Sequence, residues 1–191
     1  MTRSPLRSRP AGPPAAASGG SGGIGRRSSA AAEAVSDDLR RRDSPLLTRR
    51  RRVAGLALGA IASFVPVAAY QAGLLRHLPD PPLPFLDSDR VDASGEAYRL
   101  GLVPDSALGI ASYAATLALA TAGRDGRPPW LALATAAKVA ADAAGALLLT
   151  AEQVTRHRRV CTYCTAASAL TLAMVPQVLP EARAAWRALR G

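Results

Sequence analysis

The sequence predicts an all-α protein, a membrane four-helix bundle that follows a disordered N-terminal tail. Nearly half of its 191 residues are apolar (49%), and Ala and Leu supply most of them. Four apolar blocks follow one another, each close to the roughly 20 residues that cross a bilayer. Only 4% of the residues are aromatic, and few segments have the Val, Ile and Tyr content typical of strands.

Residues 1–48 are predicted to be a disordered, low-complexity tail. The stretch from Ala11 to Gly25 consists of Pro, Ala, Gly and Ser with almost no other residue type, and it has no hydrophobic periodicity. Such a segment cannot bury enough apolar surface to offset the entropy lost on ordering. Because the tail is rich in Arg and Ser and poor in acids, a transit peptide is the alternative interpretation.

Residues 49–182 are predicted to be the membrane domain, and residues 183–191 a basic cytoplasmic tail. In lipid the apolar blocks must be helical, because every backbone N–H and C=O group needs an internal partner. An Ala-rich soluble bundle is the alternative, but four such blocks leave few polar faces for a soluble surface. The four blocks are 53–75, 105–122, 130–150 and 160–179.

The distribution of arginine predicts the orientation, because cytoplasmic loops are enriched in Lys and Arg. Arg49–Arg52 before the first block, Arg124 and Arg127 between the second and third, and the arginines after Arg183 indicate that both termini are cytoplasmic. The acidic loop after the first block is then outside. We therefore expect a multi-pass protein of a bacterial inner (plasma) membrane. A cleaved signal peptide over Arg49–Val67 is a competing interpretation.

Two features of the charge pattern qualify this interpretation. The net charge of +10 would suit a nucleic-acid partner, but no basic stretch is interleaved with stacking aromatics and no nucleic-acid-binding motif is present. We therefore expect no nucleic-acid partner. The loop with Arg156, Arg158 and Arg159 lies outside by parity, which breaks the arginine rule locally and calls for another role for these residues.

Cys161 and Cys164 form a Cys-x-x-Cys pair where the fourth apolar block begins. A helix N-terminus stabilises a thiolate, and the three upstream arginines would add to this effect. A thiolate is the species that exchanges with disulfides. Haem attachment would need a His after Cys164, and a structural zinc site would need more ligands than the pair and His157 supply, so no metal is expected. Two inert buried cysteines are the alternative.

Lys138 and Asp142 lie four residues apart in the third block, on one face of the predicted helix. Charged residues inside a membrane usually face the bundle interior and pair there. The pair is either part of a proton or quinone site or a self-neutralising structural element.

Together these features resemble the vitamin K epoxide reductase family, over roughly residues 53 to 180. Members are four-helix membrane bundles with Cys-x-x-Cys at the outer start of the fourth helix. The segment Val103–Gly109 also resembles the one that opens the family's second helix, with Asp105 in the place of an Asn. The chain departs from many members in two ways. Residues 76–103 contain no shuttle cysteine, and no thioredoxin-like domain is present, so we expect a bacterial-type member without either.

The resemblance implies a membrane thiol–quinone oxidoreductase, which moves electrons from protein dithiols to ubiquinone or menaquinone and leaves a disulfide behind. It implies that Cys161 exchanges with a periplasmic or extracytoplasmic thiol protein and that Cys164 faces the quinone. It also implies that Asp105, Ser106 and Ser168 contact the quinone, held among the first, second and fourth spans.

Two other functions remain open. The same bundle could be a non-catalytic membrane scaffold or assembly protein, or a small transporter that uses Lys138 and Asp142. Whatever the function, the proline-rich loop from Arg76 to Gly101 is expected to fold over the outer mouth of the bundle, with Phe85 or Leu86 pointing toward it.

Overall fold

The computed structural model describes residues 29–98 and 102–191. Over these residues the chain is helical apart from one isolated β-bridge between Leu86 and Val160, which confirms the predicted all-α class. The elements in order are α1 (Ala30–Arg41), α2 (Pro45–Gln71), α3 (Ser88–Asp92), the short 3₁₀ helix η1 (Gly95–Tyr98), α4 (Asp105–Thr121), α5 (Pro129–Glu152), the π-helical turn η2 (Gln153–His157) and α6 (Thr162–Arg190).

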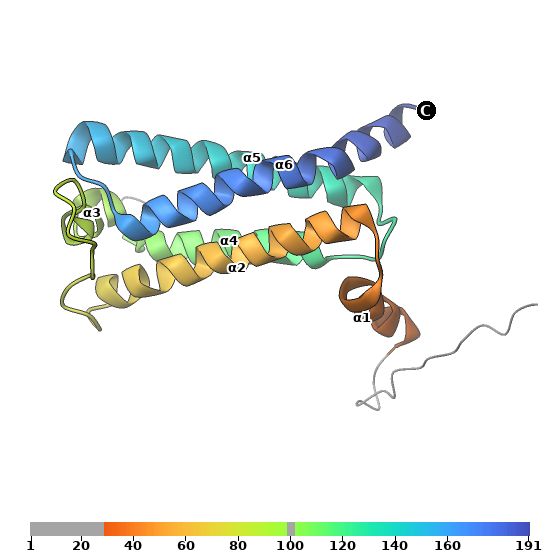
Figure 1. Ribbon diagram of the computed structural model, residues 1–191, viewed down its shortest axis with the longest axis horizontal. Helices are drawn as coiled ribbons and strands as arrows, with labels where there is room; N and C mark the ends of the chain where they lie inside the picture. The colour runs from red at the N-terminus through yellow and green to blue at the C-terminus, as the bar shows by residue number, and fades with distance from the viewer. Residues whose placement is uncertain (1–28, 99–101) are drawn as a thin grey trace, which may run out of the picture.

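Four long helices, α2, α4, α5 and α6, run side by side and form the bundle (Figure 1). Helix α2 packs closely against α4 and α6, and α6 packs against α5, whereas α4 and α5 make far fewer contacts with each other. The segment that contains α3 covers one end of the bundle, and α1 and the C-terminus lie at the opposite end. The bundle is therefore least tightly packed between α4 and α5.

Small side chains set the spacing of the helices. Along α2, Val53, Ala57 and Ala60 are almost fully buried, and they pack in one cluster with Tyr113 of α4 and Met174 of α6. Small residues at helix interfaces let the backbones approach closely. In a bilayer, where burial from water does not drive helices together, this close packing is what associates them. The abundance of alanine thus reflects close helix packing.

In the part of the chain that the structure describes, three helical segments are long and apolar enough to cross a membrane: α2, α5 with the following turn, and α6. Helix α4 has 17 residues, which is the lower limit of the usual range for a span. At 1.5 Å per residue it is about 25 Å long. The chain is thus an integral membrane protein with several candidate spans, and α4 is the shortest helix of the bundle.

Helix boundaries near both ends of the chain differ from those expected. Helix α2 begins at Pro45 rather than Val53 and ends at Gln71 rather than Leu75. Residues 30–41, expected in the disordered tail, form α1, and residues 1–28 lie outside the described part of the chain. Ser29 caps α1, and Arg51 of α2 donates to the carbonyl oxygens of Leu39 and Arg42, so tertiary contacts stabilise a helix that shows no apolar block. At the other terminus, the basic segment from Arg183 continues α6 up to Arg190.

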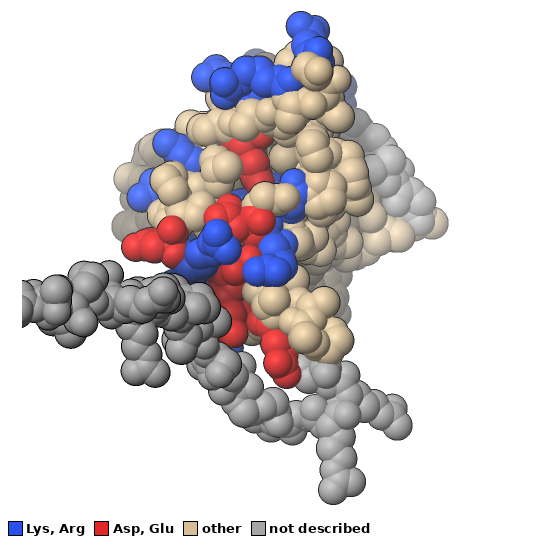
Figure 2. Space-filling view, turned by 90° about the vertical axis from the view of Figure 1, so that its right-hand side faces the viewer, with Lys and Arg blue, Asp and Glu red and all other residues tan. Residues whose placement is uncertain are grey.

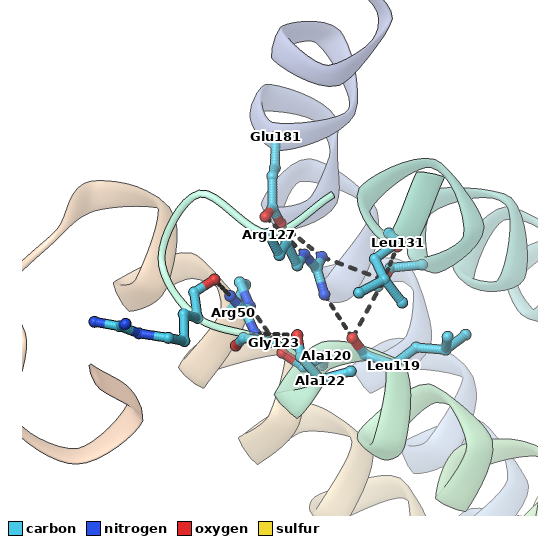
Figure 3. Close-up of polar contacts among 10 residues, drawn as sticks. Arg50, Leu119, Ala120, Ala122, Gly123, Arg127, Leu131 and Glu181 are labelled. Atoms are coloured by element: carbon cyan, nitrogen blue, oxygen red, sulfur yellow. Dashed lines mark hydrogen bonds and ion pairs between the residues drawn. The ribbon is translucent and has the colours of Figure 1, made fainter. Parts of the chain in front are cut away.

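Two buried arginines hold together the end of the bundle opposite α3 (Figure 3). Arg50 donates to the carbonyl oxygens of Ala120 and Ala122 at distances of 2.9 and 2.7 Å, and to two more beyond them, so it caps the C-terminus of α4. Arg127 makes a two-pronged ion pair with Glu181 of α6, at 2.7 and 2.8 Å. Figure 2 views this end, where arginine and acidic side chains lie next to one another.

Candidate active site

Cys161 is the N-cap residue of α6, and its sulfur accepts a hydrogen bond from the backbone N–H of Cys164 at 3.2 Å. The backbone N–H of Cys161 is held by the side chain of Gln153, which follows α5. Both cysteines are reduced, and their sulfur atoms lie within 4.8 Å of each other. The pair therefore needs only a small movement to reach the S–S bond length of about 2.05 Å.

The loop after α2 folds over the start of α6, as expected, and we call its residues 76–98 the cap; residues 99–101 of the expected segment lie outside the described part of the chain. Asp80 anchors it, since its carboxylate accepts hydrogen bonds from Thr162 at 2.6 Å and from the backbone and hydroxyl of Ser88, both at 2.7 Å. Ser88 in turn accepts from the backbone N–H of Thr162. Burial acts to raise the pKa of Asp80, but the hydrogen bonds from Thr162 and Ser88 outweigh it and hold this pKa below its usual value.

The cap side chains that pack with Cys161 are Leu78 and Val91, together with Val67 of α2. Of the two residues expected there, Phe85 is exposed, whereas Leu86 is half-buried and its backbone forms the bridge with Val160. Cys161 has an exposed fraction of 0%, so it does not present its sulfur to a partner protein while the cap is in place.

The arginines before Cys161 also have another role. Arg159 donates to the carbonyl oxygen of Pro84 in the cap, next to the bridge between Leu86 and Val160, and Arg156 pairs with Glu152. Arg159 thus contacts the cap, and Arg156 the end of α5.

Asp92, at the end of α3, is the residue that sequence reasoning missed. Its side chain is nearly fully buried, at 1% exposure, and Oδ1 accepts a weak hydrogen bond from the thiol of Cys164, with 3.6 Å between the two atoms. Within the described residues, Oδ2 has no hydrogen-bond partner. No motif or periodicity marks Asp92, because the path of the cap brings it to the cysteines.

The cysteines and Asp92 shift one another's protonation. The side chains of Cys164 and Asp92 stabilise the anion of Cys161, which outweighs burial and lowers the pKa of Cys161 to about 6. Burial raises the pKa of Asp92 to about 9, with the charge on Cys161 adding to the effect. At neutral pH, Cys161 is therefore a thiolate and Asp92 a neutral acid.

A cavity of about 500 Å³ lies below this cluster, and Cys164 and Asp92 form part of its wall. Its surface is mostly apolar, and its size falls in the range that holds a small organic ligand. The residues from the bundle and the turn after α5 are Phe64, Asp105, Leu108, Gly109, Ser112, Tyr113, Ala141, Asp142, Gly145, Ala146, Leu149, Glu152, Gln153, His157, Cys164, Ala167 and Ser168. The cavity thus lies among α4, α5 and α6, with Phe64 as the contribution of α2, so it borders the third span as well as the first, second and fourth.

The predicted quinone-contacting residues separate into two groups. Asp105 and Ser168 line the cavity. Ser106 is fully buried and does not line it, because its hydroxyl donates to Gln71 of α2 at 2.5 Å. Gln71 also donates to Asp105 at 2.9 Å, so this one residue fixes the start of α4.

Gly109 allows an aromatic wall to form beside the cavity. A Cβ atom at this position would lie 2.9 Å from the ring of Phe64. The ring of Phe64 stacks on Tyr113, with 6.0 Å between the ring centres, and the hydroxyl of Tyr113 bonds to Thr171 of α6 at 2.6 Å. A larger residue at Gly109 would therefore displace this wall.

Lys138 and Asp142 form the expected ion pair, with distances of 2.5 and 2.7 Å between Nζ and the carboxylate oxygens. Ser112 and Thr116 of α4 both donate to Asp142, and Ser112 accepts from Lys138. The pair thus points into the bundle and connects α5 to α4, the two helices that otherwise make few contacts. Asp142 and Ser112 also line the cavity.

The cluster at the mouth of the cavity falls one ligand short of a structural metal site. One ligand atom each from Asp92, Cys161 and Cys164 lies within 4.8 Å of the others. The residue that accompanies the cysteines is Asp92, whereas the sequence pointed to His157. Structural zinc sites use four protein ligands, so these three alone would leave one position open.

The fold and the site define an integral membrane protein with a Cys-x-x-Cys pair between an extramembrane cap and an apolar cavity. Residues 52–179 match the model of the vitamin K epoxide reductase family, and the chain belongs to this family. Its members are quinone-dependent thiol oxidoreductases. Comparisons with curated proteins and with solved structures found no match.

Proposed function

We propose that the protein oxidises protein dithiols and passes their electrons through Cys161 and Cys164 to a membrane quinone. The observation that carries this proposal is the position of Cys164, which lies on the wall of an apolar cavity while its backbone N–H contacts the sulfur of Cys161. One cysteine is thus placed toward an apolar ligand and the other toward the cap.

The cavity fits a quinone ring in size and in chemistry. Its walls are mostly apolar, and Asp105 and Ser168 supply polar groups near Cys164. When bound, a quinone accepts the two electrons and two protons released as a dithiol becomes a disulfide. Ubiquinone and menaquinone both remain candidates.

The charge distribution supports distinct roles for the two cysteines. The Cys161 thiolate is the nucleophile of the reduced pair. It would bond to the Cys164 sulfur as the S–H bond of Cys164 breaks and the two electrons of the pair pass to the quinone. A donor dithiol, from a thiol protein on the cap side, restores the pair by exchange at Cys161. This exchange requires movement of the cap, since the cap covers Cys161 completely.

A non-catalytic scaffold is the second candidate, because the burial of Cys161 also suits a structural cysteine. The test is quinone reduction by purified protein with a dithiol donor, followed by ultraviolet absorbance. We expect Cys164→Ser to abolish turnover, and Cys161→Ser to block turnover but retain quinone binding. Thr155→Ala, on the exposed turn after α5, is the control and should leave turnover unchanged. Absence of quinone reduction by the unaltered chain would favour the scaffold, and unchanged turnover in the double cysteine variant would overturn the role of the cysteines.

A further inference from the structure

The proposed reaction needs a route for protons as well as electrons. Reduction of a quinone takes up two protons, and the residues that release them must have access to the cavity. Cys164 lines the cavity and carries a thiol proton, but Cys161 neither lines the cavity nor contacts solvent. As a thiolate it also has no proton to give. A second proton donor is therefore required at the cavity wall.

Asp92 occupies the place that this donor must have. It lines the cavity beside Cys164, and its carboxylate lies within 4.8 Å of both sulfur atoms. Its unpaired Oδ2 is buried, so the free energy cost of this group is not offset by a hydrogen bond within the described residues. Perturbed, unpaired acids of this kind cluster at functional sites.

We infer that Asp92 is a catalytic acid–base residue that supplies the second proton to the quinone, and this inference rests on the proposed function. The reduced site starts as Cys161 thiolate, Cys164 thiol and Asp92 carboxylic acid. An S–S bond forms, the S–H bond of Cys164 and the O–H bond of Asp92 break, and two electrons and two protons pass to the quinone. The negative charge thus moves from the sulfur of Cys161 to the carboxylate of Asp92.

The reverse transfer restores the site. A donor dithiol that reduces the disulfide gives up two electrons and two protons. One proton goes to Cys164 and the other to Asp92, while Cys161 is released from its disulfide with the donor as the thiolate. Loss of the thiolate charge on oxidation removes one cause of the raised pKa of Asp92, and its return on reduction restores it. The protonation of Asp92 therefore follows the redox state of the cysteines.

Other titratable groups share the cavity wall with Asp92 or act on it electrostatically. They come from α2, the cap, α4, α5 with its following turn, and α6. They are Tyr70, Glu96, Asp105, Tyr113, Asp142, Glu152, His157, Cys161 and Cys164. Among the described residues, Asp92 is the carboxyl group that has an oxygen atom within 4.8 Å of both sulfurs.

The test uses infrared difference spectra of the full chain in lipid, with no quinone present. The chain is reduced with dithiothreitol and then oxidised with diamide. We expect oxidation to remove a carbonyl band of a protonated carboxyl group, and we expect Asp92→Asn to lack this change. Asp92→Glu should keep an acid and shift the band. Asp87→Asn, which alters another acid of the cap outside the cavity, should retain the wild-type band.

A second readout is a single turnover with a soluble quinone, where Asp92→Asn should slow reduction by about 10²–10⁴-fold, the usual contribution of a general acid. A circular dichroism spectrum and a gel-filtration profile like those of the wild type show that this variant has folded. A wild-type rate or an unchanged band in Asp92→Asn would overturn the role of Asp92 and leave the proposed function intact. Absence of quinone reduction by the unaltered chain would instead overturn the proposed function and this inference with it.

Discussion

Asp92 destabilises the folded protein at neutral pH. Burial raises its pKa to about 9, so the folded state retains a proton that the unfolded chain releases above its ordinary pKa of 3.8. Below pH 3.8 both states are protonated, and Asp92 costs no stability through its titration. As the pH rises from there toward 9, the folded state progressively loses stability relative to the unfolded chain. A residue with this cost is expected where function requires it.

Asp92→Asn should therefore change the pH dependence of unfolding. Between pH 4 and 6 the wild type should lose about 1.4 kcal/mol per pH unit relative to the variant. Above pH 6 the effect is partly offset, because the lowered pKa of Cys161 makes the folded state release a proton that the unfolded chain keeps. Denaturant unfolding in detergent at pH 4, 5 and 6 would measure this. A stability difference that stays constant over this range would contradict it.

At the level of single residues, the sequence predicted what local geometry determines. The spacing of Cys161 and Cys164 and the start of a helix at that point were sufficient to place both at a helix N-terminus. Asp92 was not predicted, because it acts on Cys161 and Cys164, which lie 69 and 72 positions further along the chain. Gln71 was not predicted, because it acts on Asp105, which lies 34 positions away. Arg50 was counted only as part of a topology signal, whereas it is buried and caps α4.

At the level of elements, each apolar block corresponds to one long helix. The boundaries were accurate for α4 and α5, where Pro104 and Pro128 immediately precede the helix. Helix α1 was missed because contacts with Arg51 and Arg124 stabilise it rather than an apolar stripe. The position of the cap over the bundle was predicted from loop length, but the residues that pack beneath it depend on its fold.

The cap should control access to Cys161. Asp80→Ala removes the acceptor for hydrogen bonds from Ser88 and Thr162, so the cap should open more often. We expect alkylation of Cys161 by a small thiol reagent to become about tenfold faster, which corresponds to the loss of about 1.4 kcal/mol of closing free energy. Mass spectrometry of the labelled peptide would measure the rate. Asp87→Asn, on the same cap, keeps a good N-cap for α3 and should alkylate at the wild-type rate.

The pair of Lys138 and Asp142 should matter mainly for the contact between α4 and α5. Removing one partner leaves a charge in the membrane interior, so Lys138→Ala and Asp142→Ala should each cost more than the double variant. Lys138→Ala should lower the free energy of unfolding by about 3 kcal/mol. Asp142→Ala should lower it by less, because a quarter of the Lys138 side chain left without its partner is exposed. Unfolding in detergent tests this, and three equal losses would argue against coupling.

At the level of the whole molecule, the charges divide between the two ends of the bundle. The end with α1 and the C-terminus carries Arg49–Arg52 and the arginines from Arg183 onward. The cap end combines Arg76, Arg90 and the arginines around Arg158 with five acids between Asp80 and Glu96. The excess of arginine at the first end predicts that it faces the cytoplasm.

Cysteine labelling should determine this orientation, with new cysteines placed at exposed positions because Cys161 is buried. In a chain without Cys161 and Cys164, we expect a membrane-impermeant maleimide to label Phe85→Cys in intact cells. Arg190→Cys should be labelled only after the membrane is permeabilised. The reverse pattern would place the cap in the cytoplasm.

The sparse packing between α4 and α5 determines how a ligand can arrive. The cavity is lined on one side by Leu108 and Ser112 of α4 and on the other by Ala141 and Gly145 of α5. It therefore lies along the loosely packed interface between these two helices. A molecule with a long isoprenoid chain is already concentrated in the bilayer and diffuses in two dimensions. It could slide in sideways from the lipid with its chain trailing between the helices, and its ring would never have to cross an aqueous phase.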